Sequence, residues 1–111
     1  MGEKRRIENA IQVLEENYLK IMTVYEWAGE MGYSRSCFCR LFKKEFGLCP
    51  KDQLKTFRLK LIKAELRKNP DAIGYEVAVN TGFSDSKSLR KFLYTHYDTN
   101  LTTIKAYLAY I

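Results

Sequence analysis

Two groups of side chains in this sequence could recognise a polyanion through hydrogen bonds. The first group has the spacing i, i+3, i+4 and i+7 and comprises Ser36, Cys39, Arg40 and Lys43. The second group repeats that spacing and comprises Lys87, Arg90, Lys91 and Tyr94. This spacing places four side chains on one face of a helix. Arg and Lys can donate to guanine O6 and N7 in the major groove, and Ser and Tyr can contact bases or phosphates. The alternative interpretation is two solvated cationic faces.

Other chemistries find little support. In a helix, Cys37 and Cys39 point about 200° apart, so both cannot ligate one metal ion. With Cys49 they make an odd count, which is typical of a reducing cytosol and not of a disulfide framework. The single His96 falls beside an apolar face and no motif pairs it with a nucleophile. A glycine-rich phosphate loop is also missing, so we expect no enzyme, metal or cofactor.

Composition and charge are compatible with a nucleic-acid partner. The chain has 111 residues and a mass of 13.0 kDa, enough for one domain or two very small ones. It is 46% hydrophobic, with a net charge of +6. Residues 1–34 carry a net charge of −2, whereas residues 35–68 carry +8. We find neither a signal peptide nor a run of ~18 apolar residues, and we expect a soluble cytoplasmic protein.

Helical periodicity extends along almost the whole chain. Residues 6–18 show one apolar stripe, made of Ile7, Ala10, Ile11, Leu14 and Tyr18. Further helices are predicted from their capping residues over 23–31 (capping box Thr23 and Glu26, end at Gly32), 34–47 (cap Ser34), 50–69, about 71–82, 84–97 (cap Ser84 or Asp85) and 102–110. No segment alternates with a period of two, so the predicted class is all-α with about seven helices.

Each basic stripe lies opposite an apolar face of its own helix. On the first helix this face comprises Cys37, Phe38, Leu41, Phe42 and Phe46, together with Glu45. On the second it comprises Leu89, Phe92, Leu93 and Tyr97, with His96 beside them. The split predicts one buried and one exposed face on each helix.

The two helices belong to an internal repeat. Residues 28–34 read Ala-Gly-Glu-Met-Gly-Tyr-Ser and residues 78–84 read Ala-Val-Asn-Thr-Gly-Phe-Ser, fifty positions later. Each copy predicts a short helix, a glycine turn, an aromatic residue and a capped second helix, which is a helix-turn-helix. The basic stripes are fifty-one residues apart, so the second copy has one extra residue between its turn and its stripe.

The helix between the copies is apolar on two sides. One side carries Leu54, Phe57, Leu61 and Ala64, and the other carries Leu59, Ile62 and Leu66. Such a helix is expected to be packed on both sides. Over residues 50–68 it would be about 28 Å long. A rigid helix of this length suits two DNA-reading helix-turn-helix units held about one DNA turn, ~34 Å, apart.

These residues resemble the AraC/XylS-type transcription regulators. The resemblance covers the chain from about Ile7 to Leu108 and is strongest over residues 32–47, Pro50, Arg58-Leu59 and residues 78–93. It implies a seven-helix DNA-binding domain with two recognition helices in successive major-groove segments. It departs from the family pattern at Cys39, Ile62, Leu89, Leu93 and Tyr94, and in the loop after the second recognition helix, where Asn100 can cap the last helix.

The resemblance also indicates which residues contact DNA. The family's base-reading positions correspond to Ser36, Cys39, Arg40, Ser86, Lys87, Arg90 and Lys91, to which we add Arg35. The expected phosphate contacts are Ser34, Lys43, Lys44, Lys51 and Tyr94. Because Cys39 makes no strong base contact, the first helix is expected to depend on Arg40.

The resulting prediction is a bacterial regulator that binds double-stranded DNA as a monomer and activates transcription. Residues 1–49 and 70–111 would form the helix-turn-helix subdomains, joined by the linker helix over 50–69. The chain is expected either to stand alone or to form the C-terminal part of a longer regulator, which could dimerise through its other domain. Either form would act on the nucleoid. RNA polymerase is a possible second partner. The alternative is a protein-interaction module of the same fold with little DNA affinity.

Overall fold

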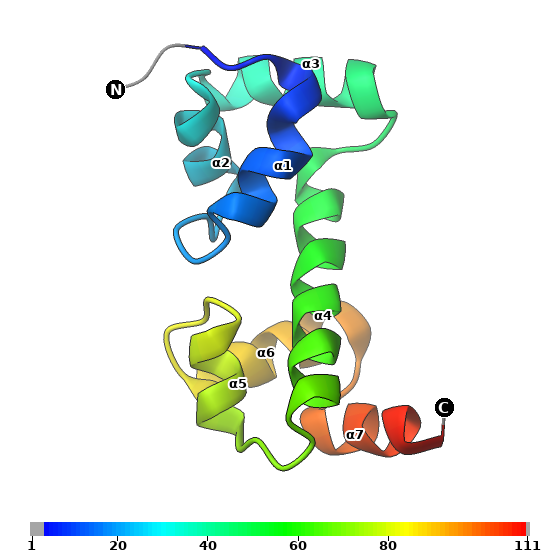
Figure 1. Ribbon diagram of the computed structural model, residues 1–111. Coiled ribbons are helices and arrows are strands. Elements are labelled where there is room, and N and C mark those ends of the chain that lie inside the picture. Colours follow the sequence, from blue (N-terminus) through cyan, green and yellow to red (C-terminus); the bar gives the residue numbers. More distant parts are fainter. Residues whose placement is uncertain (1–3, 111) are drawn as a thin grey trace. The chain divides into compact units, whose positions relative to one another are not determined.

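The computed structural model describes residues 4–110 (Figure 1). This part of the chain contains a short 3-10 helix, seven α-helices and no strand. The helices are η1 (Ile7–Asn9), α1 (Ala10–Glu16), α2 (Val24–Met31), α3 (Arg35–Phe46), α4 (Pro50–Lys68), α5 (Gly74–Asn80), α6 (Ser86–Tyr97) and α7 (Leu101–Tyr110). The predicted all-α class is confirmed.

In the first helix-turn-helix, the capping residues set the helix boundaries as predicted. Thr23 Oγ1 accepts from the Glu26 N–H at 3.1 Å, and Glu26 Oε1 accepts from the Thr23 N–H at 3.0 Å, which completes the capping box. Helix α2 then ends at Gly32, whose φ of 85° is a left-handed conformation that glycine adopts without strain. Ser34 caps α3 directly after this turn.

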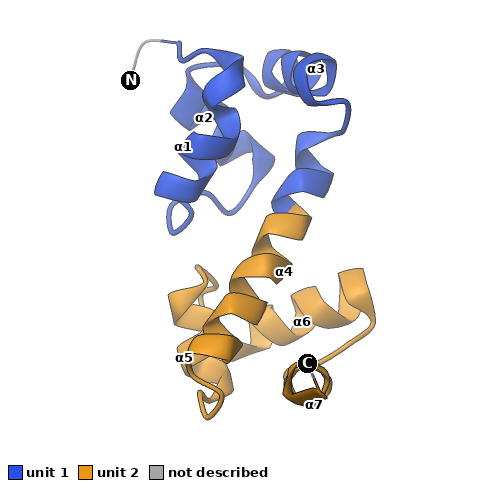
Figure 2. Cartoon of the chain, turned by 45° about the vertical axis from the view of Figure 1, so that its right-hand side comes forward, with its two compact units in different colours: residues 1–54 blue, residues 55–111 orange. Residues whose placement is uncertain are grey.

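The chain divides into two compact units (Figure 2). Unit 1 is Met1–Leu54 and contains α1, α2, α3 and the first turns of α4. Unit 2 is Lys55–Ile111 and contains the rest of α4 with α5, α6 and α7. Each unit holds one copy of the repeat seen in the sequence.

The core of unit 1 contains a cluster of three aromatic rings. The rings of Phe38 and Phe42 lie 5.2 and 5.1 Å from the Trp27 ring, centroid to centroid. All three side chains are fully buried, and the indole Nε1 of Trp27 donates to the Ala10 carbonyl at 3.0 Å. This bond satisfies the polar atom of a buried tryptophan and fastens α1 to α2.

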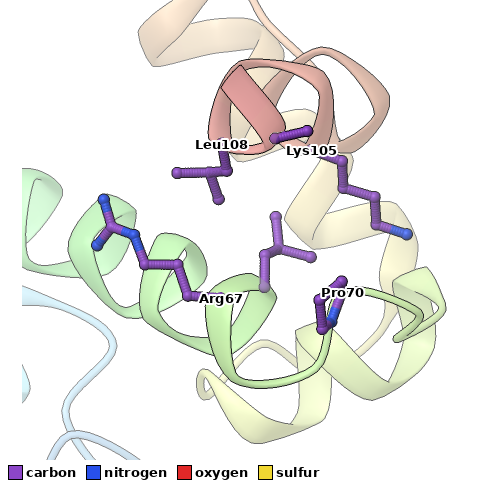
Figure 3. Close-up of a pocket in the computed structure, with 6 residues that line it drawn as sticks. Arg67, Pro70, Lys105 and Leu108 are labelled. Carbon is purple, nitrogen blue, oxygen red and sulfur yellow. The ribbon is translucent and has the colours of Figure 1, made fainter. Parts of the chain in front are cut away.

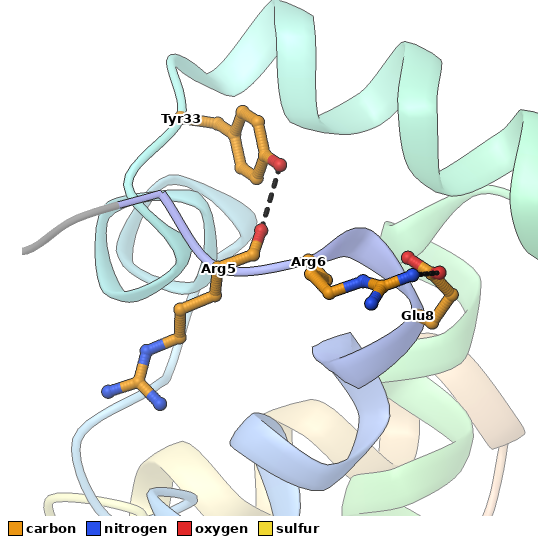
Figure 4. A network of polar contacts seen from close by, with 4 residues as sticks. All are labelled: Arg5, Arg6, Glu8 and Tyr33. Carbon is orange, nitrogen blue, oxygen red and sulfur yellow. Dashed lines mark hydrogen bonds and ion pairs between the residues drawn. The ribbon is translucent and has the colours of Figure 1, made fainter.

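The amino-terminal segment of unit 1 is bonded to the turn of its helix-turn-helix (Figure 4). The Arg5 N–H donates to the Met31 carbonyl at 2.9 Å, and the Tyr33 hydroxyl donates to the Arg5 carbonyl at 2.8 Å. Next along the chain, the Arg6 guanidinium pairs with the Glu8 carboxylate at 2.9 Å. The backbone hydrogen bond of Glu8, followed by this arginine, lowers the pKa of the Glu8 carboxyl.

The core of unit 2 is mainly aliphatic and contains a buried cation. Val77, Leu89 and Leu93 are buried. Arg58 of α4 is only 3% exposed; its Nη1 donates to the Thr81 carbonyl at 2.6 Å, and its guanidinium lies 5.8 Å from the Phe83 ring centroid. Arg58 therefore fastens α4 to the turn between α5 and α6.

Several predicted helix boundaries differ from the structure. The helix expected over 6–18 begins as η1 and ends at Glu16, because Asn17 leaves the helical conformation (φ −129°, ψ 24°) and its side-chain Nδ2 bonds to the Val13 carbonyl at 2.9 Å. The helix expected from about 71 begins at Gly74, because Ile73 is extended and its N–H donates to Glu76 Oε1 at 3.0 Å.

Two side chains assigned to apolar faces are also exposed. Glu45, which the helical pattern placed on the buried half of α3, is exposed, as a carboxylate without a buried partner should be. Ala64 of α4 is exposed as well. The buried side of α4 instead carries a spacing of four residues, made of Leu54, Arg58, Ile62 and Leu66.

Candidate nucleic-acid interface

The basic stripe of α3 is exposed along most of its length. Ser36, Arg40 and Lys43 are exposed, whereas Phe38 and Phe42 on the opposite side are fully buried. Cys39 is half-buried, so the stripe has a less accessible position at its centre. The α3 stripe therefore presents two cations and a hydroxyl group to solvent, with aromatic side chains packed on the opposite side of the helix.

Local hydrogen bonds hold the amino-terminal part of this stripe. Ser34 Oγ accepts from the Cys37 N–H at 3.3 Å, which fixes the first turn of α3. Arg40 Nη2 lies 3.6 Å from Cys37 Sγ, one turn away on the same helix. The guanidinium of Arg40 thus lies along its own helix, beside a thiol that is a weak acceptor.

The basic stripe of α6 is exposed in the same way. Lys87, Arg90, Lys91 and Tyr94 are exposed, and Tyr94 has 72% of its surface accessible. The opposite side carries Leu89 and Leu93, which correspond to Phe38 and Phe42 of α3 at an offset of fifty-one residues. The offset expected for the second copy therefore also applies to its buried face.

The extra residue of the second copy lies at the cap of α6. Asp85, and not Ser84, is the capping residue: its Oδ1 accepts from the Ser88 N–H at 2.8 Å, and this bond lowers the pKa of the Asp85 carboxyl. The Ser84 hydroxyl instead lies 3.3 Å from the Ser88 hydroxyl. One inserted residue thus changes the cap from a hydroxyl to a carboxylate.

The remaining predicted contact residues are distributed over the same elements. Ser34, Arg35, Lys44 and Lys51 are exposed in unit 1, with Lys44 in the last turn of α3 and Lys51 in the first turn of α4. Ser86 of unit 2 is half-buried at the start of α6. Each unit thus carries its own set of predicted DNA-contacting residues.

A pocket of about 350 Å³ adjoins the α6 stripe in unit 2. Its lining includes Ile73 and Tyr75 at the start of α5, and Ser86 and Arg90 of α6. Two base-reading candidates therefore border a hollow that the sequence did not indicate. A pair of tyrosines fifty residues apart, Tyr25 and Tyr75, precedes the two repeat segments and is the sequence signal for this region.

A second pocket, of about 320 Å³, lies between the end of α4 and α7 in unit 2 (Figure 3). Arg67, Pro70 and Leu108 line it, and so does Lys105, whose Nζ donates to the Ala72 carbonyl at 2.9 Å. Its lining is aliphatic or cationic and includes no Ser, Thr, Cys, His, Asp or Glu side chain.

The other residues with potential chemistry are dispersed. Cys37 and Cys39 are half-buried and Cys49 is exposed. Within residues 4–110, no three His, Cys, Asp or Glu side chains are grouped so as to hold a metal ion. The His96 ring lies 5.1 Å from the Phe92 ring. None of the helices over residues 4–110 has the length and apolar character needed to cross a membrane.

Known proteins provide an independent comparison. A family model described as a helix-turn-helix domain matches residues 27–106. The fold is similar to the DNA-binding domain of AdpA, a global transcriptional factor solved in complex with a target DNA (21% identity, 96% of both chains covered, TM-score 0.73).

It is also similar to the C-terminal domain of the two-component response regulator YesN from Fusobacterium nucleatum subsp. nucleatum (23% identity, 88% of this chain and 95% of that chain covered, TM-score 0.74). No curated protein matches the sequence. The family match spans most of the chain and both copies of the repeat. The chain belongs to the AraC/XylS-type helix-turn-helix family.

Proposed function

We propose that this chain binds double-stranded DNA sequence-specifically and regulates transcription, with α3 and α6 as its recognition helices. The observation that carries the proposal is the pair of exposed cationic stripes, each with a buried apolar face behind it and a glycine turn before it. The similarity of the fold to a DNA-binding domain solved with its target DNA supports it. Such a protein acts on the bacterial nucleoid.

The side chains divide into two roles. Arg40 and Arg90 each occupy a central position of their stripe, although at the offset of fifty-one residues Arg90 corresponds to Cys39. A guanidinium can donate two parallel hydrogen bonds to a guanine edge. Lys43 at the end of the α3 stripe and Lys44 beside it suit phosphates, which accept from a point charge. Base contacts then set sequence preference, while phosphate contacts set affinity and its dependence on salt.

Two recognition helices in one chain predict an asymmetric site with half-sites centred about 10 bp apart. Selection of bound duplexes from a random pool would define this site. Arg40→Ala and Arg90→Ala are each expected to cost about 1–3 kcal/mol of binding free energy and to relax preference at one position. The two affected positions should lie in different half-sites.

Arg6→Ala is a matched control, because it removes an exposed arginine that pairs with Glu8. It should leave base preference unchanged at every position. Equal loss of affinity on all sequences for the Arg40 and Arg90 variants would reject their base-reading role. Wild-type binding to random duplex weaker than about 0.1 mM at moderate salt would instead favour a protein-interaction module.

The direction of regulation is a separate part of the proposal. The family resemblance favours activation, with RNA polymerase as a second partner. Transcription in vitro from a promoter carrying the selected site should rise when the protein is added. A fall in transcript yield would assign repression, and it would leave the DNA-binding proposal intact.

A further inference from the structure

The internal repeat extends further toward the amino terminus than its turn. Tyr25-Glu26 in α2 corresponds to Tyr75-Glu76 in α5, again fifty residues apart. Each tyrosine is the second residue of the first helix of its helix-turn-helix. The two units therefore place the same side chain at the same position, although most of their other surface residues differ.

The glutamates of this pair have a structural explanation, but the tyrosines have none. Glu26 Oε1 accepts from the Thr23 N–H and Glu76 Oε1 accepts from the Ile73 N–H, each at 3.0 Å, so each carboxylate closes the start of its helix. Tyr25 is 73% exposed and Tyr75 is 60% exposed. Within residues 4–110 neither hydroxyl makes a hydrogen bond, so the folded chain itself does not use these two donors.

The surroundings of Tyr75 link it to the recognition helix. Tyr75, Ser86 and Arg90 line the same pocket of about 350 Å³ in unit 2. The start of α5 also lies close to the start of α6, since a Cβ added at Gly74 would be 3.6 Å from the Ser86 Cβ. The phenol therefore borders the part of α6 that carries two of the base-reading candidates.

We propose that Tyr25 and Tyr75 are a matched pair of DNA-backbone contacts, in which each hydroxyl donates a hydrogen bond to a phosphate oxygen beside the groove that its own unit reads. In a helix-turn-helix the first helix crosses the phosphate backbone while the second enters the groove. Tyrosine hydroxyls are among the donors that bind phosphate oxygens. This inference rests on the proposed function and adds two residues to its contact set.

A tyrosine contact differs from a lysine contact in a measurable way. The hydroxyl is neutral, so its hydrogen bond adds affinity without replacing a counterion. Tyr75→Phe and Tyr25→Phe should each weaken binding about tenfold. The loss should be equal on the selected operator and on an unrelated duplex, and the slope of log K against log salt should stay the same. Lys43→Ala, in contrast, should reduce that slope by about 1.

Fluorescence anisotropy with labelled duplexes at several salt concentrations measures both quantities. Tyr110→Phe is the matched control, because Tyr110 is 92% exposed on α7, outside both helix-turn-helix segments, and its variant should bind like the wild type. The thermal midpoint of each variant, followed by circular dichroism, should equal that of the wild type, since the removed hydroxyls are exposed.

The outcomes separate this inference from the proposed function. If the wild type binds DNA but both Phe variants bind equally well, the tyrosine pair is wrong and the DNA-binding proposal stands. If the variants lose affinity only on the operator, the tyrosines read bases, which also overturns a backbone contact. If the wild type binds no duplex, the proposed function itself fails.

Discussion

Units 1 and 2 follow one plan with different interiors. In unit 1, α2 and α3 meet through Trp27, Phe38 and Phe42, and the Phe46 ring lies 4.5 Å from that of Phe42. In unit 2 the corresponding positions of α6 are Leu89 and Leu93, and a buried arginine from α4 completes the core. The comparison shows that this helix-turn-helix unit requires an apolar helix face and a glycine turn. Different sets of apolar side chains can then fill its core.

The exposed faces of the two units differ as well. The α3 stripe has two cations, Arg40 and Lys43, beside a serine and a cysteine. The α6 stripe has three cations, which are Lys87, Arg90 and Lys91. The remaining predicted contacts reverse this order, because Arg35, Lys44 and Lys51 are further exposed cations of unit 1. With five cations against three, unit 1 is expected to supply more of the salt-dependent affinity.

The largest difference in stability between the two units is expected from a substitution in the aromatic cluster of unit 1. Trp27→Ala removes a fully buried ring and its hydrogen bond to Ala10, and should cost unit 1 about 3–5 kcal/mol of unfolding free energy. Urea unfolding followed by circular dichroism should then show early loss of part of the helical signal. The signal of unit 2 should persist to higher urea.

Leu93→Ala makes the matched change in unit 2 and should cost about 2–5 kcal/mol. Trp27 is the single tryptophan of the chain, so its fluorescence reports on unit 1. In the Leu93 variant the fluorescence transition should shift less than the circular dichroism transition. Equal shifts of the two probes would show that the units unfold as one cooperative body, contrary to this expectation.

A smaller effect is expected from the buried cation of unit 2. Arg58→Met keeps an unbranched chain but removes the donor to the Thr81 carbonyl, which should cost about 1–3 kcal/mol of unfolding free energy. Because this bond reaches the turn before α6, the variant should also lose preference mainly at the half-site read by α6. Loss of preference at both half-sites alike would contradict this local role.

The fold was largely predictable because its signals are local. The Thr23 and Glu26 capping box, the Gly32 turn and the Ser34 cap each act within a few residues, and the structure confirms all three. The start of the helix at Gly74 was predicted too early, because the extended Ile73 and its bond to Glu76 have no strong sequence signature. Boundaries set by such weak caps are the least certain part of a sequence-based prediction.

The buried role of Arg58 shows what the sequence could not supply. Charged residues are rarely buried, so the residue type gave no reason to place an arginine in the core. Its acceptor, the Thr81 carbonyl, lies twenty-three residues away and becomes available only when the turn after α5 forms. The contact set for DNA stays a prediction for a related reason: exposure permits a base contact, but only the bound duplex determines which exposed side chains make one.

The cysteines offer a further test, because all three lie in unit 1. With Cys37 and Cys49 changed to serine, alkylation of Cys39 by N-ethylmaleimide should weaken operator binding about tenfold, since the adduct projects from the proposed reading face of α3. Bound operator should also slow the alkylation. A variant retaining only Cys49 is the control, and equal inhibition through Cys49 would place the effect outside the α3 stripe.

The smallest expected effect concerns the two recognition-helix caps. Ser34 is an uncharged cap, and Ser34→Ala should cost about 1 kcal/mol of unfolding free energy. Asp85 is an ionised cap whose pKa is lowered below 3.8, first by the backbone N–H of Ser88. Its stabilising contribution is therefore present above about pH 3.8 and is lost as the pH falls through the folded-state pKa.

Amide exchange measured by NMR can compare the two caps directly. The protection factor of the Ser88 amide, which donates to Asp85, should fall below about pH 4, while that of the Cys37 amide, which donates to Ser34, should change much less. Asp85→Ser gives α6 the cap of α3 and should remove the difference, because a hydroxyl does not titrate in this range. If the protection factor of the Ser88 amide still fell at low pH in that variant, Asp85 would not be the cause of the difference between the two caps.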